Sequence, residues 1–420
     1  MGRIGIEMVE PGMVLAEDLI NSNGRFLLGK GAKLDPSHLR VLKIWGVHSI
    51  EVEGSCSDHV VSHPDEIDSA VLQAAEEWEA KRFFHCNLDD PFPRELFRIC
   101  TLRKARDMVR QQNRKETVSF TPDLAPISGS KLIPPSFDRE IDPQDLLDRD
   151  AGLASLPDIF TEISRVISDP TSSAVHVADA ISKDTSLSAK LLRIVNSAFY
   201  SFPSKIDTIS RAVTIIGTRQ LSTLAMGASV IKVFQNIPAD LVDMESFWKH
   251  SIACGVSARI IASYKNISNT ERLFVAGLLH DIGRILLYTT LPHVEKEILL
   301  WARRTHGLLT NAEIEALRID HAQIGGMLLK KWKLSLVLEH GVAYHHAPLN
   351  SQHPLESSIV SLSDILANAM GIGSSGEHLV PPLMPGVWEE LALPTEVLTQ
   401  IIQLTDRQVA EIIHHFFNEE

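Results

Sequence analysis

The sequence predicts a mainly α-helical protein, in which a small β-rich N-terminal module precedes an all-helical C-terminal domain. Of the 420 residues, 44% are hydrophobic but only 6% are aromatic, a balance that favours helices packed on helices. Apolar residues recur at helical spacing through most of the chain after residue 153. The first 54 residues instead carry short apolar stretches separated by turn residues, which is typical of strands.

The β-rich module is expected over residues 1–54. Short strands are predicted at 13–15 and 26–28, and residues 49–52 alternate between polar and apolar as in a half-exposed strand. Between them, Asp35-Pro36 is a helix-opening pair and predicts one helix in this module.

Residues 65–111 form the next predicted segment, which is helical. Charged residues alternate with apolar ones at helical spacing in 70–84 and again in 94–110, and a proline-containing break separates the two helices. Residues 112–150 are polar, contain five prolines and have few large apolar side chains, so they cannot bury enough surface to offset the entropy of ordering. We therefore predict a flexible linker there, and the most protease-sensitive part of the chain.

The C-terminal helical domain, with a helical extension at its end, is expected over residues 151–420. Apolar residues at i, i+3, i+4 and i+7 predict helices in 156–167, 184–199 and 206–216, and Gly217 has the position of a C-terminal helix cap.

Composition and charge exclude several classes of function. A formal net charge of −13 disfavours nucleic acid as a partner, because such binding requires a basic surface. The four cysteines form no CxxC pair, which indicates neither a zinc knuckle nor a disulfide framework. There is no run of 18 apolar residues and no apolar N-terminal signal. We expect a cytoplasmic protein without membrane contact.

Histidine and aspartate residues recur inside otherwise apolar segments of the C-terminal domain. Imidazoles and carboxylates are ligands that Zn, Mn and Fe prefer, and a buried polar group without a partner is costly. The candidate metal ligands are His250, His280, Asp281, His321, His345 and Asp364. The alternative is that they are hydrogen-bonded core histidines and helix caps, and spacing alone does not separate the two.

The order of these residues resembles the HD superfamily of metal-dependent phosphohydrolases. More specifically, residues 153 to about 350 resemble the HDOD domain, an HD-related output domain of bacterial signalling proteins. The resemblance rests on the segments Leu192–Tyr200, Ile209–Val213, Phe247–Ser251, Gly277–Arg284 and His321–Gly325, with Leu156-Pro157 and Trp332. The run from Val9 to Gly31 resembles the small module that precedes HD-GYP cyclic-dinucleotide phosphodiesterase domains.

The HDOD resemblance implies a non-catalytic regulatory protein that acts in bacterial signal transduction by binding other signalling proteins. It implies no required cofactor and no catalytic residue. Two departures from the active HD-GYP pattern agree with this. Ala347-Pro348 follows His345-His346 where the active enzymes have a Glu and a Gly-Tyr-Pro loop, and Arg284 replaces their Lys.

The alternative function is a metal-dependent phosphohydrolase that acts on a nucleotide or cyclic dinucleotide. In that case the surviving His/Asp set would hold a near-stoichiometric divalent metal, Mn, Fe or Zn, whereas a non-catalytic domain is expected to hold such a metal at partial occupancy at most. Arg284, as a permanent planar cation, would then bind the substrate phosphate.

Overall fold

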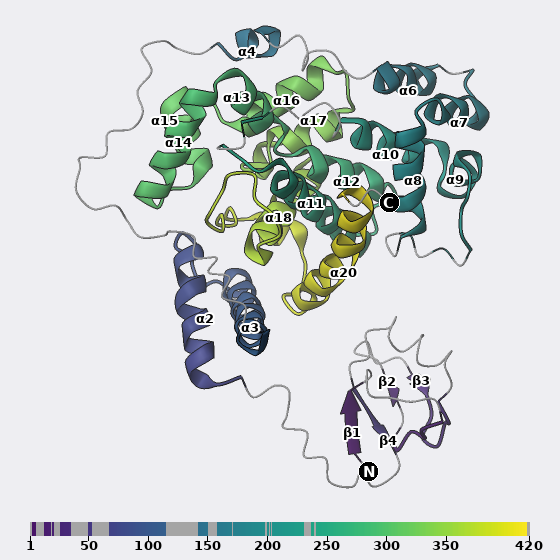
Figure 1. Ribbon diagram of the computed structural model, residues 1–420, viewed down its shortest axis with the longest axis vertical. Coiled ribbons are helices and arrows are strands. Elements are labelled where there is room, and N and C mark those ends of the chain that lie inside the picture. The colour runs from purple at the N-terminus through teal and green to yellow at the C-terminus, as the bar shows by residue number, and fades with distance from the viewer. Residues whose placement is uncertain are drawn as a thin grey trace. The chain divides into compact units, whose positions relative to one another are not determined.

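The computed structural model shows a mainly helical chain that divides into two compact units, Met1–Ile67 and Asp68–Glu420 (Figure 1). The structure describes residues 67–114, 142–149, 158–230 and 237–417, with gaps at 170, 198–199, 201, 203 and 239–240, and short stretches between residues 2 and 52.

The first unit contains two pairs of short antiparallel strands. Strand β1 (Gly2–Gly5) pairs with β4 (Ser49–Val52), and β2 (Leu19–Ile20) pairs with β3 (Phe26–Leu28). The stretch predicted as a strand at 13–15 contributes an isolated bridge from Val14 to Lys33. The helix expected after Asp35-Pro36 lies outside the described residues, as does much of 1–54, so the β-rich module as a whole is not confirmed.

The second unit begins with two helices that pack on each other, α2 (Ser69–Arg82) and α3 (Pro91–Arg114), at the positions that helical spacing predicts. The Asp68 side chain caps α2 by accepting a hydrogen bond from the Ala70 amide. Arg82 donates hydrogen bonds to the carbonyl oxygens of Asn368 and Ala369, and thereby joins this helical pair to the rest of the unit.

Within the range predicted as a linker, helix α4 (Pro143–Arg149) packs against α13 in the same unit. Leu146 and Leu147 are buried, and Lys331 Nζ lies 2.9 Å from the Leu147 carbonyl oxygen and 2.8 Å from an Asp148 oxygen. Residues 115–141, the greater part of the predicted linker, lie outside the described residues.

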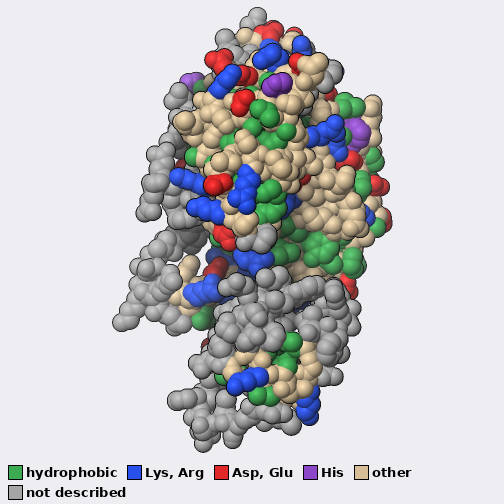
Figure 2. All heavy atoms as spheres, turned by 90° about the vertical axis from the view of Figure 1, so that its right-hand side faces the viewer, with side chains coloured by type: hydrophobic (Ala, Val, Ile, Leu, Met, Phe, Trp, Pro, Cys, Tyr) green, Lys and Arg blue, Asp and Glu red, His purple; other side chains and the backbone are tan. Residues whose placement is uncertain are grey.

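Five helices then form one side of the C-terminal domain. Three of them begin at a side-chain cap: Ser173, Asp184 and Thr208 each accept a backbone hydrogen bond, and Gly217 ends the helix that Thr208 caps, with φ +100°. The helices are α6 (Asp158–Ser168), α7 (Ala174–Ser182), α8 (Thr185–Asn196), α9 (Ile209–Ile216) and α10 (Thr218–Val230). On the face shown in Figure 2, basic, acidic and hydrophobic side chains are interspersed.

The long helix α11 (Met244–Tyr264) packs against α12, α18 and α20, and further helices follow it along the chain (Figure 1). They are α12 (Thr270–Leu279), α13 (Ile282–Thr290), α14 (Pro292–Thr305), α15 (Leu309–Leu317), α16 (His321–Lys331), α17 (Leu336–Ala343), α18 (Pro354–Met370), α19 (Val387–Leu391) and α20 (Val397–Phe417). The run Thr270–Thr290 is long and apolar enough to cross a membrane by length and composition, but 89% of its most apolar window is buried inside the domain.

Three glycines allow the close contacts that build the centre of the domain. A Cβ on Gly277 would lie 2.8 Å from Gly255 Cα, so these glycines let α12 approach α11. A Cβ on Gly283 would lie 2.0 Å from the His321 carbonyl oxygen. The start of α13 therefore contacts the start of α16 directly, and this brings Asp281 near His321.

Candidate metal centre

The six predicted ligands come from separate parts of the fold and meet in its interior. His250 lies in α11, His280 and Asp281 join α12 to α13, and Asp364 lies in α18. His321 is the first residue of α16, and His345 follows α17. None of the six is more than 5% exposed.

Four of these residues form one group, which we call the HHDD group: His250, His280, Asp281 and Asp364. His250 Nε2 lies 3.1 Å from Asp364 Oδ1 and 3.3 Å from His280 Nε2. His280 Nε2 in turn lies 3.1 Å from Asp281 Oδ2. Two ligand atoms about 2.1 Å from one ion lie roughly 3.0 to 3.5 Å apart, so this spacing suits a single divalent cation.

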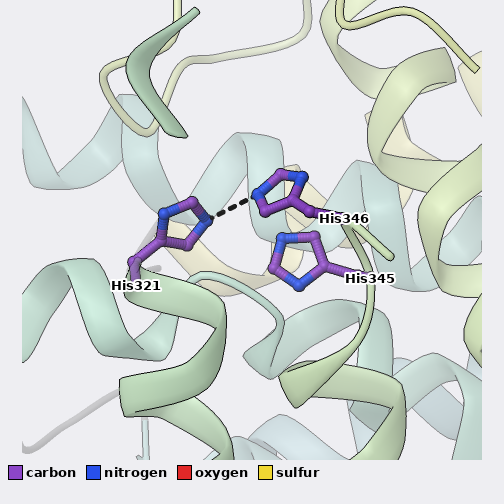
Figure 3. A group of neighbouring side chains, drawn as sticks. All are labelled: His321, His345 and His346. Carbon is purple, nitrogen blue, oxygen red and sulfur yellow. Dashed lines mark hydrogen bonds between the residues drawn. The ribbon is translucent and has the colours of Figure 1, made fainter. Parts of the chain in front are cut away.

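A second group consists of three histidines, His321, His345 and His346, which we call the triple-His group (Figure 3). The side chains of His345 and His346 lie next to each other and point toward His321, whose Nε2 is 3.0 Å from His346 Nε2. Asp281 links the two groups, because its Oδ1 lies 3.0 Å from His321 Nε2.

Three of the imidazoles are oriented by an acceptor at Nδ1. The Nδ1 atoms of His280 and His345 each lie 2.7 Å from a backbone carbonyl oxygen, of Gly277 and Val342, and His321 Nδ1 lies 2.5 Å from Glu313 Oε2. These oxygens only accept, so Nδ1 keeps its proton and the Nε2 lone pair of the neutral ring points into the centre. This is the arrangement found in metal-binding histidines.

Several buried atoms at the centre make no hydrogen bond within the described part of the chain. They include His345 Nε2 and Asp281 Oδ2. Both carry lone pairs, and an uncompensated buried acceptor is costly unless a proton or a cation satisfies it. The residues present therefore fit a divalent cation.

The charges at the centre balance without a metal. Burial alone would raise the pKa of Asp281, but Arg284 and His280 hold it well below its usual range. Burial alone would lower the pKa of His280, but the nearby Asp281 carboxylate keeps the pKa of His280 well above its ordinary value. Burial and Arg284 act to lower the pKa of His321, but Glu313 and the hydrogen bond to Asp281 outweigh them and raise it to about 9.

Asp364 and Glu313 also keep a lowered pKa, because neighbouring histidines outweigh the effect of burial on each carboxylate. Three carboxylates thus face three cations, Arg284 and the protonated His280 and His321. In contrast, burial and the two neighbouring charged histidines lower the pKa of His345 to about 3, so its ring stays neutral.

In chelator-treated protein we expect the free energy of unfolding to fall between about pH 7 and about pH 9.5. A histidine whose pKa is raised by folding stabilises fully below its unfolded pKa of about 6.5, and that contribution is lost as the pH rises through the folded value. For His321 that value is about 9. Urea unfolding at several pH values measures the change. The surface variant His293→Gln should follow the wild-type profile, and a flat profile in the wild type would contradict this charge assignment.

Arg284, the predicted phosphate-binding residue, lies inside the centre. Its Nε is 3.2 Å from Asp281 Oδ1 and 3.9 Å from Glu313 Oε1, and the residue is only 2% exposed. The nearby Glu295 is also buried, and burial together with the charge of Glu313 holds its pKa well above the usual range. Arg284 therefore faces internal carboxylates.

Sequence reasoning missed three residues of the site. His346 was passed over as a ligand although it is adjacent to His345, and this adjacency was the available signal. Glu313 orients His321 through Nδ1 and also accepts from its backbone amide at 2.9 Å. Asn368 donates to Asp364 Oδ1 at 2.8 Å from one turn further along α18. An i, i+4 polar pair in an apolar helix was the signal for Asn368, whereas nothing in the sequence marked Glu313.

A cavity of about 550 Å³ reaches the edge of the triple-His group. Its lining includes His346 and Thr310, whose Oγ1 lies 3.1 Å from His346 Nε2. The turn between α2 and α3 supplies His85 and Asp90 on another wall. None of the described residues that line this cavity is Lys or Arg.

Comparison with known proteins identifies the helical domain. Residues 153–348 match the family described as the HDOD domain. A solved HDOD domain protein of unknown function from Geobacter sulfurreducens aligns with a TM-score of 0.55 and 21% identity, covering 66% of this chain and 97% of that one. A solved protein from Marinobacter aquaeolei VT8 that is named for signal transduction aligns with a TM-score of 0.50 and 21% identity, covering 64% of each chain.

Among curated proteins, an uncharacterized protein of Treponema pallidum (strain Nichols) is 26% identical over 207 residues. The match covers 48% of this chain and 39% of that protein, so it spans well under half of the relative's length. The family match covers the residues for which the sequence predicts the resemblance, 153 to about 350. Residues 153–348 of this chain, just under half of its length, match the HDOD domain.

Proposed function

We propose that this chain is a non-catalytic signal-transduction protein, whose HDOD domain acts by contact with other signalling proteins. The observation that carries the proposal is the placement of Arg284. This cation lies 3.2 Å from Asp281 Oδ1 and 3.9 Å from Glu313 Oε1 and is 2% exposed, so its charge is directed at internal carboxylates and not at the protein surface, although its Nε and Nη1 make no hydrogen bond among the described residues. A hydrolase needs such a group at the substrate, because phosphoryl chemistry depends on stabilising the charge of the transferred group.

The charge balance of the centre supports the same function. With His280 and His321 protonated, the three ionised carboxylates are already compensated. A divalent cation has to displace those protons, which weakens its apparent affinity at neutral pH. We therefore expect the HHDD group to hold metal at partial occupancy only. The triple-His group has no carboxylate of its own and shares Asp281, so a two-metal cluster would lack ligand charge.

The experiment is a hydrolysis assay with the full chain, loaded with Mn²⁺, Fe²⁺ or Zn²⁺, on a cyclic dinucleotide and on bis(p-nitrophenyl) phosphate. We expect no turnover above that of the free metal ion. Turnover by the wild type that is lost in Asp364→Asn, a variant of nearly the same size, would contradict the proposal.

A second function, metal-dependent phosphohydrolysis, is favoured by one observation: the cavity of about 550 Å³ reaches His346 at the triple-His group. A bound metal would supply a water of lowered pKa. The chain would contribute His280 and Asp281 as metal ligands. The hydroxyl group of Thr310 would position a group of the substrate beside His346. The absence of Lys and Arg from the described lining disfavours an anionic substrate, so this function ranks second.

A further inference from the structure

A second cavity, of about 350 Å³, lies where α6, α10, α12 and the turn between α16 and α17 meet. It lies in the HDOD domain, and its lining shares no residue with the candidate metal centre. Its volume is at the lower end of the range typical of small-molecule sites. The residues that line it are Ser164, Arg219, Thr223, Met226, Asn269, Arg272, Lys333, Leu334, Ser335 and Leu338.

The lining is positively charged. It includes Arg219, Arg272 and Lys333, and none of the described lining residues is Asp or Glu. The Nε atom of Arg272 is buried and makes no hydrogen bond within the described part of the chain. An unsatisfied buried guanidinium nitrogen is costly, and an anion in the cavity would satisfy it with a charge-assisted hydrogen bond.

Two helices begin at this cavity without a side-chain cap. Asn269 is the N-cap of α12 and Ser335 is the N-cap of α17, and neither side chain accepts the hydrogen bond that a capping residue normally accepts. The free amides of a helix N-terminus and its positive dipole end favour an anion. Here they add to three cationic side chains.

The cavity also offers an acceptor. Asn269 Oδ1 is buried and has no hydrogen-bond partner among the described residues. An inorganic anion cannot donate to it, but a hydroxyl group of a ligand can. The combination of an anion site and an unused acceptor suits a molecule that has both a phosphate and a hydroxyl group.

We propose that this cavity binds a small hydroxyl-bearing organic phosphate, with the phosphate between Arg219, Arg272 and Lys333. The site is separate from the metal centre, but it contacts the two helices that lead into that centre. His280 is the residue after α12, and His345 lies two residues after α17. A ligand bound at this site would therefore contact the two helices that lead to the metal centre, and it could transmit a signal to that centre through them.

The test is isothermal titration of the full chain with ribose 5-phosphate, in a chelator and in a buffer without phosphate or sulfate. We expect binding that weakens as NaCl is added, because exposed Arg219 and Lys333 contribute screened charge. Arg272→Gln should weaken binding by about tenfold or more, since a charge-assisted hydrogen bond is lost. Asn269→Leu should weaken the binding of ribose 5-phosphate. It should leave the binding of inorganic phosphate, which is weaker in the wild type, unchanged.

Arg304→Gln, on the exposed surface of α14, is the matched control and should bind as the wild type does. Thermal unfolding of each variant shows whether it is folded. If Arg272→Gln is unstable, the double variant Arg219→Gln/Lys333→Gln replaces it, because both of these side chains are exposed. No binding by the wild type, or equal weakening in Arg304→Gln, would overturn the proposal. The chelator removes any metal, so either result leaves the proposed function of the metal centre untouched.

Discussion

Asp281→Ala is expected to lower the free energy of unfolding by about 3 to 5 kcal/mol, the loss typical of breaking a buried ion pair from one side. Asp281 lies at the middle of the centre, with Oδ2 3.1 Å from His280 Nε2, and with Oδ1 3.0 Å from His321 Nε2 and 3.2 Å from Arg284 Nε. Its removal leaves Arg284 buried, with Glu313 at 3.9 Å as its remaining carboxylate. Urea unfolding at pH 7 in the presence of chelator measures this loss.

Asp281→Asn is the matched variant, because it keeps the shape of the side chain and removes its charge. Since the charge carries most of the effect, we expect Asp281→Asn to be destabilised nearly as much as Asp281→Ala. Stability within about 1 kcal/mol of the wild type in Asp281→Asn would show that the carboxylate charge does not hold the centre together.

Arg82→Ala has the second largest expected effect, a loss of about 3 kcal/mol. The guanidinium donates to the carbonyl oxygens of Asn368 and Ala369 at the end of α18, and Nη1 lies 2.9 Å from Glu79 Oε2. It also lies 5.0 Å from the centre of the Trp78 ring, which adds a cation–π contact. The variant leaves Glu79 and two carbonyl groups without this donor in the interior.

Denaturant unfolding of the full chain measures the loss, and two controls make it specific. Arg98→Ala removes an arginine of an i, i+3 pair whose side chain is 56% exposed, and it should change stability by less than about 0.5 kcal/mol. The double variant Glu79→Leu/Arg82→Met replaces the buried pair by apolar groups and should recover most of the loss. Equal effects of Arg82→Ala and Arg98→Ala would refute the role of Arg82 in docking α2 and α3.

Much of the helical architecture follows from periodicity. The apolar stripe at 206–216 and the glycine after it predicted α9, because an apolar face must be buried and Gly217 adopts a φ of +100° without strain. The same reasoning did not predict α4, since 143–149 is a short segment in polar sequence whose two leucines are buried only through packing on the domain. Helices of this length depend on tertiary contacts.

The candidate site was predictable as a set of residues but not as a geometry. Histidine and aspartate in apolar helices pointed to partners in the interior, and the structure brings all six together. Their division into the HHDD and triple-His groups depends on how α13 meets α16, which Gly283 permits through a contact that no sequence pattern encodes. The inward placement of Arg284 likewise depends on Glu313. The sequence does not mark Glu313, because its partner His321 is eight residues away across a helix boundary.

The most direct test of a non-catalytic, proton-compensated centre is the metal content of the full chain, purified without chelator at pH 7. The charge balance of His280 and His321 against Asp281, Asp364 and Glu313 predicts well below one divalent ion per chain. Metal content after equilibration with Mn²⁺ should rise as the pH is raised toward 9, where His321 loses its proton. One or two ions per chain, retained at pH 7 through dialysis, would contradict the account and favour the hydrolase.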